Sequence, residues 1–168
     1  GAMIGVATPA DALDLLNRAK AETGGAVEAF ELMGRLGVDF ALRNIPGTRD
    51  PLAQPHPWYV LAEFGDSGPT EMLRSLVEGA LEPNEAVLAQ SEEQSRQLWR
   101  IRESIPEAQV REGPSIKHDI SVPIADIPDF IETVCAEILA SLPGIRPCVF
   151  GHVGDGNLHF NLQAPKTM

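Results

Sequence analysis

The alternation of apolar and polar positions predicts regular elements from the start of the chain. Residues 4–8 form an apolar run, and the Thr-Pro pair at positions 8 and 9 supplies an N-cap and a first-turn proline for a helix. Apolar residues then recur at helical spacing until Gly24 and Gly25, which end the helix. Residues 26–33 alternate as a strand does, so a strand is expected to follow.

Further elements are predicted on both sides of a proline-rich loop. Residues 43–57 (RNIPGTRDPLAQPHP) resist regular structure because each proline removes a backbone donor, and His56 among them is expected to be a surface loop residue. The expected elements are a short helix through Leu36 and Phe40, strand 58–64, helix 69–81, strand 86–90, a helix from Glu92 with Ser91 and Gln94 as its capping box, strand 115–123, helix 126–141 and a hairpin over 147–164.

This order of elements predicts an α+β fold. Two rounds of strand, helix and strand with short connections favour a sandwich in which helices cover one face of a mostly antiparallel sheet. The 168 residues suit one domain. Residues 1–3 (Gly-Ala-Met) look like the remnant of a cleaved tag, so we expect them to add nothing to the fold and assign the domain to residues 4–168. The end of the chain, directly after a strand-like run, favours an excised domain.

Composition narrows the function classes. Thirteen Lys and Arg against 24 Asp and Glu give a net charge of −11, which repels nucleic-acid backbones and anionic lipid headgroups. No apolar stretch approaches the roughly 20 residues that span a bilayer. Cys135 and Cys148 lie in apolar surroundings without CxxC spacing, which favours free thiols in a reducing compartment, hence the cytoplasm. One disulfide between them is the alternative.

The sharpest motif is the run FGHVGDGNLHFN at 150–161. Asp155-Gly156 suits a two-residue hairpin turn, which would place His152 directly opposite His159 with Cβ atoms about 5 Å apart. Two such imidazoles can hold a metal ion, and Asn161 would point to the same face. The alternative is a simple cross-strand histidine pair, because a zinc site needs at least three protein ligands.

Cations cluster in one part of this acidic chain. Arg102 borders the apolar face of the predicted helix, so its guanidinium can turn toward the sheet, and Pro106 should bend the helix at the Arg102 carbonyl. Such a bend can shape an anion site, and a solvated helix face is the alternative. Five of the 13 cations fall within 22 residues, namely Arg96, Arg100, Arg102, Arg111 and Lys117.

The run SIKHDISVP at 115–123 adds two candidate residues. Strand alternation places His118 on the apolar face, where a hydrogen-bonded core histidine is expected more often than a catalyst. Lys117 and Asp119 then share the open face, where a surface ion pair is the alternative to a binding role.

These motifs resemble a known family. SIKHDISVP, FGHVGDGNLHFN, LWRIRESI and RDPLAQPHPWYVLAEF are similar to the C-terminal, substrate-side domain of FAD-linked 2-hydroxy-acid dehydrogenases, over about residues 4–164. That group includes D-lactate dehydrogenases, the glycolate oxidase flavin subunit and D-2-hydroxyglutarate dehydrogenase. The resemblance implies a ferredoxin-like domain laid over a flavin that another domain binds.

The resemblance also implies roles for individual residues. His152 and His159 match metal-binding histidines, for zinc or another divalent ion, Arg102 and Lys117 match groups that hold the substrate carboxylate, and Asn161 matches a substrate-contacting asparagine. A third metal ligand and the catalytic base would follow Met168. Some relatives that use 2-hydroxyglutarate carry Thr at the position of Pro106 and Tyr at that of His118, which argues against that substrate here.

Together these observations favour the substrate and metal-binding domain of an enzyme that oxidises a small D-2-hydroxy acid to the 2-oxo acid. Its expected partners are the hydroxy acid and the chain's own flavin-binding domain, with a homodimer left open. The competing interpretation is a non-catalytic ligand-sensing or assembly module on the same scaffold, because fold does not imply function.

Overall fold

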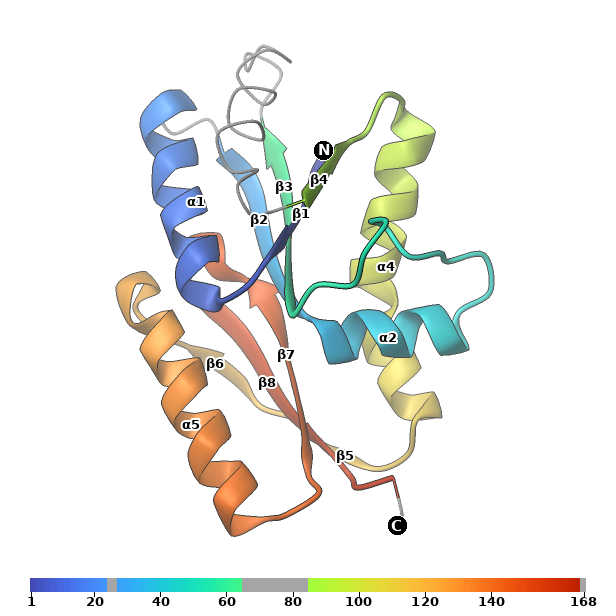
Figure 1. Cartoon of the computed structure of the whole chain (residues 1–168), viewed down its shortest axis with the longest axis vertical. Helices are drawn as coiled ribbons and strands as arrows, with labels where there is room; N and C mark the ends of the chain where they lie inside the picture. Colours follow the sequence, from blue (N-terminus) through green and yellow to red (C-terminus); the bar gives the residue numbers. More distant parts are fainter. Residues whose placement is uncertain (24–26, 65–84, 167–168) are drawn as a thin grey trace.

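A computed structural model describes residues 1–23, 27–64 and 85–166, and these form one antiparallel sheet flanked by helices (Figure 1). The sheet runs in the order β4-β1-β3-β2-β7-β8-β5, with β6 also paired to β8. Its strands are β1 (Ala2–Val6), β2 (Val27–Gly34), β3 (Trp58–Phe64), β4 (Glu85–Leu88), β5 (Ser115–Ile116), β6 (Asp119–Ser121), β7 (Arg146–His152) and β8 (Asn157–Gln163). The helices are α1 (Pro9–Thr23), α2 (Arg35–Asn44), α4 (Glu92–Arg111) and α5 (Ile127–Ser141), with 3-10 turns η1 (Ile124–Asp126) and η2 (Val153–Asp155).

Most of the predicted elements are confirmed, together with the α+β class and the antiparallel sheet. The expected helix 69–81 lies outside the described residues. The start of α4 forms as its sequence predicts, because Ser91 Oγ accepts a hydrogen bond from Gln94 N at 3.1 Å. The helix continues through Pro106 to Arg111. No helix in the described part of the chain is long and apolar enough to cross a membrane.

The helices cover both faces of the sheet, so the expectation of a single covered face is wrong. In Figure 1, α1 and α5 lie on one side of the sheet and α2 and α4 on the other. Phe30 and Leu32 of β2 pack in the core beneath α1 and α5, whereas Met33 packs in the core beneath α2 and α4. Strands buried on both faces read as continuous apolar runs rather than as alternating ones. All five residues of β1 are accordingly buried.

The first residues of the chain belong to the fold, which corrects a second expectation. Ala2 pairs with Ala62 of β3 on one side and with Leu88 of β4 on the other. Met3 is fully buried beneath α2 and α4. A sequence that resembles a tag remnant does not show whether its residues pair in a sheet. Here Ala2 and Met3 belong to β1, which is hydrogen-bonded to β3 on one side and to β4 on the other.

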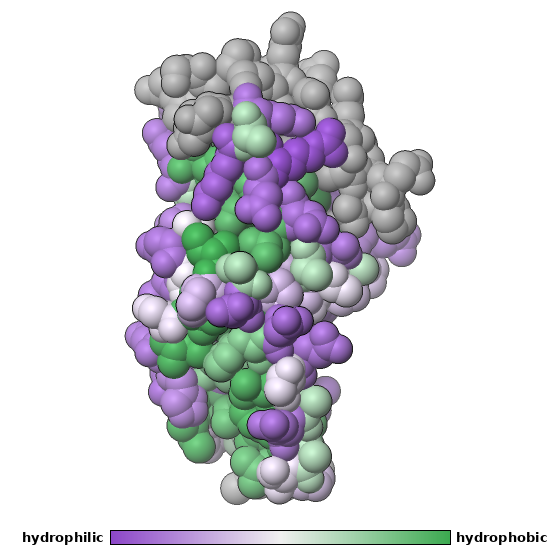
Figure 2. Space-filling model, turned by 90° about the vertical axis from the view of Figure 1, so that its left-hand side faces the viewer, coloured by the Kyte–Doolittle hydropathy of each residue, from purple (hydrophilic) through white to green (hydrophobic). Residues whose placement is uncertain are grey.

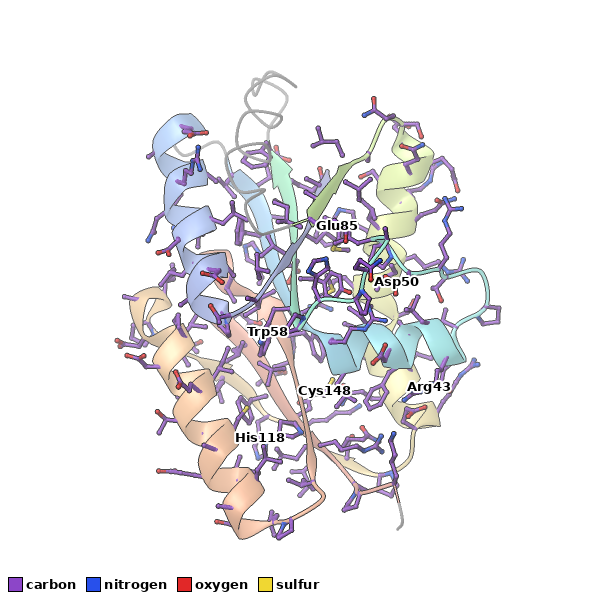
Figure 3. All side chains as sticks on the ribbon, in the orientation of Figure 1. Arg43, Asp50, Trp58, Glu85, His118 and Cys148 are labelled. Atoms are coloured by element: carbon purple, nitrogen blue, oxygen red, sulfur yellow. The ribbon has the colours of Figure 1, made fainter. Side chains whose placement is uncertain are left out.

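The proline-rich loop is anchored to the sheet through His56. Its side chain is only 17% exposed, and its Nε2 lies 2.8 Å from Glu85 Oε1 at the start of β4. The ring packs edge-on against Tyr59 and fits over Gly5, where a side chain would overlap it. The hydrogen bond to His56 holds the pKa of Glu85 below its ordinary value. His56 is therefore an anchor within the fold, not the surface residue expected. Figure 3 labels Glu85 beside this loop.

Helix α5 is more apolar than its burial requires. Only Ile127 and Ile131 are fully buried in it, and Leu139 is 46% exposed. Figure 2 shows apolar surface between hydrophilic side chains on the side covered by α1 and α5.

Both cysteines are free thiols, Cys148 buried and Cys135 half-buried, so the free-thiol prediction is confirmed.

Candidate functional site

The glycine-rich hairpin has a different register from the one predicted. Phe150, not His152, lies opposite His159, and the strands are joined by η2 and Gly156 instead of a two-residue turn. Gly156 has φ 82°, and a Cβ there would overlap the carbonyl oxygen of Val122. The register differs by two residues, so alternation keeps the histidines on one face, but the directly opposed pair does not form.

His152 is turned toward the neighbouring strand β2. It pairs in register with Glu31, and its Nδ1 accepts a hydrogen bond from Phe30 N at 3.3 Å. An imidazole that accepts at Nδ1 carries its proton on Nε2. Neither nitrogen then offers a free lone pair, so this geometry does not prepare His152 to bind a metal ion.

His159 is oriented by a ring on one side and a carboxylate on the other. It stacks on Phe150 with ring centroids 4.8 Å apart and planes 24° apart, and its Nδ1 pairs with the carboxylate of Asp119. A carboxylate at Nδ1 fixes the imidazole and leaves Nε2 as the acceptor. The side chain of His159 is 29% exposed, so solvent and small ligands can reach it.

Arg102 reaches the same phenyl ring from α4. Its guanidinium carbon lies 4.8 Å from the centroid of Phe150, and its Nε lies 3.3 Å from Glu31 Oε2 without a hydrogen bond between these atoms. Both side chains of this ion pair are largely buried. The two terminal nitrogens of Arg102 have no hydrogen-bond partner among the described residues, and two such parallel donors match a carboxylate.

The other helix cations are solvated, as the alternative interpretation predicts. Arg96 is 68% exposed beside Glu93, and Arg111 is half-exposed beside Glu107. Arg100 is exposed and donates to the carbonyl of Pro46. Within this group only Arg102 turns toward the sheet, and there the solvated-face alternative is wrong.

The expected strand 115–123 is interrupted at Lys117 and His118, which separate β5 from β6. Both residues are exposed, so the prediction of a core His118 is wrong, although its Nδ1 does bond the carbonyl of Phe160 at 3.0 Å. Figure 3 labels His118 near the end of the sheet away from Glu85. Asp119 pairs with His159 instead of with Lys117. Lys117 has no ion pair within the described ranges.

Asn161 is buried, only 4% exposed, and both ends of its amide are engaged within the domain. Nδ2 donates to Gln109 Oε1 and Oδ1 accepts from His118 N, each at 3.0 Å. A direct contact between Asn161 and a substrate stays a prediction. What the structure shows is an asparagine that joins α4 to the segment carrying Lys117.

The structure brings Arg102, His159 and Asn161 together on the α4 side of the sheet, with three residues that sequence reasoning missed. His152 lies beside Glu31 on β2, and Lys117 is exposed at the edge of the sheet. Glu31, Phe150 and Gln109 orient Arg102, His159 and Asn161. Glu31 carried a signal, because it is a lone charge in the apolar run of residues 29–33. Phe150 and Gln109 carried none, since an aromatic residue in a strand and a glutamine in a helix are ordinary.

The described residues do not assemble the expected metal site. Across the described ranges, no three His, Cys, Asp or Glu side chains form a group that could hold a metal ion. His152 is engaged with the backbone of β2, so of the two hairpin histidines only His159 keeps an available nitrogen. The donor set of this part of the chain therefore does not fit a divalent metal.

A separate cleft lies at the other end of α4. It has a volume of about 770 Å³ between the proline-rich loop, β4 and the first turns of the helix, with Arg49, Gln90, Gln94 and Gln97 among its polar lining residues. None of the five predicted site residues lines it. The group around Arg102 is the better candidate site because the charged side chains of Arg102 and Glu31 are largely buried and held in place.

Comparison with known proteins identifies the family of this domain. Residues 2–167 match the family described as FAD linked oxidases, C-terminal domain. The chain belongs to this family. The recognition made from the motifs is therefore confirmed.

Over the aligned residues, several longer relatives are about a third identical to this chain. A D-2-hydroxyglutarate dehydrogenase of Xanthomonas citri pv. viticola is 37% identical over 83% of this chain and 30% of its own length. The mitochondrial D-2-hydroxyglutarate dehydrogenase of Arabidopsis thaliana is 33% identical over 89% of this chain and 27% of its own. A mitochondrial protein of Schizosaccharomyces pombe, provisionally named a D-lactate dehydrogenase, is 32% identical over 96% of this chain and 33% of its own length.

The chain therefore spans about a third of the length of these relatives. Among solved structures, an alkyldihydroxyacetonephosphate synthase matches with a TM-score of 0.50 at 9% identity, covering 98% of this chain and 36% of that one. At such low identity this likeness supports the fold alone.

Proposed function

We propose that this chain is the substrate-side domain of an FAD-dependent dehydrogenase that oxidises a small D-2-hydroxy acid to the 2-oxo acid. The observation that carries the proposal is the buried Arg102, held by Glu31 and Phe150 with its terminal nitrogens unpaired, on the same ring as the Asp119-paired His159. Membership of the FAD-linked oxidase family supports the cofactor. The flavin-binding part would lie outside this chain.

The substrate class follows from what the named relatives share. D-2-hydroxyglutarate and D-lactate both carry a carboxylate next to a secondary alcohol. The terminal nitrogens of Arg102 would bind one carboxylate in parallel, and the ammonium of Lys117 would add a second contact from the edge of the sheet. A carboxylate held at two points limits the orientation of C2, and so determines which enantiomer directs its C2 hydrogen toward the flavin.

The remaining roles concern proton and hydride transfer. When bound by the rest of the protein, FAD would supply the acceptor for the hydride from C2 of the alcohol. His159 Nε2 accepts a hydrogen bond from the substrate hydroxyl, while Asp119 keeps the proton of the ring on Nδ1. The base that takes the hydroxyl proton stays a prediction for the segment after Met168. Metal assistance is also only a prediction, and we assign no step to it because the donor set does not fit.

The experiment that tests the proposal uses the full-length protein with FAD bound. D-lactate, D-2-hydroxybutyrate, D-malate and D-2-hydroxyglutarate are each added without an electron acceptor, and bleaching of the visible flavin absorption is followed by stopped flow. The matched L-isomers serve as controls. At least one D-acid should reduce the flavin rapidly, and failure of every acid would overturn the proposal. The cellular location and a homodimer remain predictions.

A further inference from the structure

We propose that Gln109 is a positioning residue that sets the place of Lys117 through a buried chain of amides. This inference rests on the proposed function, in which Lys117 binds the substrate carboxylate. Gln109 and Gln163 are fully buried, and Asn161 is 4% exposed. Three neutral amides buried together are costly unless each donor and acceptor is paired.

The direction of the hydrogen bonds between these three amides follows from Gln163, whose side chain is anchored to the backbone. Gln163 Nε2 donates to two backbone carbonyls, those of Gln109 at 3.3 Å and Gly113 at 3.0 Å. Carbonyls only accept, so this end of Gln163 must be its NH₂ group, and its Oε1 faces Gln109. Gln109 Nε2 lies 3.5 Å from that oxygen, which turns Gln109 Oε1 toward Asn161. Asn161 then presents Oδ1, and not Nδ2, to His118.

This orientation changes the edge of the sheet. In a regular antiparallel ladder His118 N would donate to the carbonyl of Phe160, its partner in register. Here Asn161 Oδ1 takes that donor, and the carbonyl of Phe160 bonds the ring of His118 instead. The reciprocal ladder bond, from Phe160 N to the carbonyl of His118, persists at 2.8 Å. The strand therefore opens between β5 and β6 while it stays attached to β8.

Lys117 is the residue that this opening displays. The pairs Ile116–Leu162 and Asp119–His159 bracket it, so it lies across from Asn161 in register. A lysine side chain is flexible and carries a point charge, so its place depends largely on its backbone. Without the Gln109 bond the Asn161 amide can rotate, His118 N can return to the carbonyl of Phe160, and the backbone at Lys117 moves.

The test compares steady-state kinetics of the full-length, FAD-loaded enzyme with the D-2-hydroxy acid that the parent enzyme uses best. Gln109→Leu should raise KM about fivefold or more, as for the loss of one hydrogen bond, while kcat stays within about twofold. Gln97→Leu, at an exposed glutamine of the same helix, is the matched control and should leave KM unchanged. In a Lys117→Ala background, Gln109→Leu should add no further increase in KM.

A second variant covers the case in which Gln109→Leu does not fold. Gln109→Glu keeps the size, and at acidic pH its neutral carboxylic acid has one acceptor and one donor, as the amide does. Its KM relative to that of the parent should therefore fall as pH falls. An unchanged KM for Gln109→Leu, or the same increase with and without Lys117, would overturn the inference. If the parent enzyme oxidises no D-2-hydroxy acid, the proposed function fails instead.

Discussion

Arg102 lies over the ring of Phe150, with its guanidinium carbon 4.8 Å from the ring centroid. The same ring stacks on His159, so one aromatic side chain of β7 packs against both polar groups and holds them in place. A guanidinium over a ring is attracted by the negative charge of the aromatic face, and this cation–π attraction is stronger for buried groups than for exposed ones. The helix residue and the hairpin residue are thereby joined, although they are far apart in the sequence.

The first prediction concerns this guanidinium. In the full-length enzyme, Arg102→Ala should raise KM for the substrate about 10- to 150-fold, the equivalent of a charged hydrogen bond worth about 1.5–3 kcal/mol. Arg96→Ala, at the exposed arginine, should change KM little. Because Arg102→Ala leaves Glu31 buried without its partner, the double change Arg102→Ala/Glu31→Gln should restore stability but not KM. Equal KM values for the Arg102 and Arg96 variants would contradict the binding role.

The second prediction concerns metal binding. Titration calorimetry should show that this chain binds zinc far more weakly than structural zinc sites do, whose binding free energies are about 10–16 kcal/mol. The reason is that His152 Nδ1 accepts from Phe30 N, which leaves His159 as the only free imidazole of the pair. Tight binding at one ion per chain, abolished by His152→Ala/His159→Ala, would show that the hairpin rearranges to form a site.

The third prediction concerns the turn of the hairpin. Gly156→Ala should lower the free energy of unfolding by about 2–4 kcal/mol, because the positive φ is strained for alanine and the new Cβ meets the Val122 carbonyl. Gly113 also has a positive φ, but nothing lies within 4 Å of a Cβ there. Gly113→Ala should therefore cost only about 1–2 kcal/mol. Urea unfolding of both variants measures the difference, and equal losses would refute the steric argument.

The fourth prediction concerns pH. The hydrogen bond from Arg43 holds the pKa of Glu112 below its ordinary value of 4.5, and Asn44 and the charge of Arg146 add to this. A lowered pKa means that the ionised carboxylate stabilises the fold above pH 4.5 and that this stability is lost as pH falls through the lowered value. Glu112→Gln should thus lower the free energy of unfolding by about 1–2 kcal/mol at pH 7 and by progressively less below pH 4.5.

Thermal or urea unfolding from pH 7 to pH 3 checks this dependence. Glu107→Gln is the matched control, since Glu107 is 61% exposed on the same helix and should show no comparable change. A loss for Glu112→Gln that is constant across this range would mean that the carboxylate charge is not the cause.

The fifth prediction concerns the thiols. Burial raises the pKa of Cys148 to about 12 and also raises the pKa of Cys135, which is only half-buried. Because the thiolate is the reactive form, a disulfide reagent at pH 8 should modify Cys135 first and Cys148 only after unfolding. Mass spectrometry of the modified peptides distinguishes the two, and early labelling of Cys148 would contradict its burial.

The sequence by itself determined the local helices and strands and which residue types were available for a functional site. Capping at Ser91 and the helical repeat of apolar residues act within a few positions, so α4 and the inward side of Arg102 could be predicted from neighbours along the chain. The same holds for the presence of strand β2 and of the hairpin, although not for the turn that joins its strands. The four motifs together, the most specific of them at 150–161, likewise indicated the family.

Only the tertiary structure decided how these parts meet. Gln109 and Asn161 are 52 positions apart, and their bond forms because the tertiary fold brings these side chains of α4 and β8 together, which no local pattern encodes. The hairpin contacts Val122, Phe30 and Asp119, all outside it, and its register separates the two histidines that the turn residues alone would have paired. Local propensity depends on nearby residues, whereas register and side-chain pairing depend on contacts between distant segments.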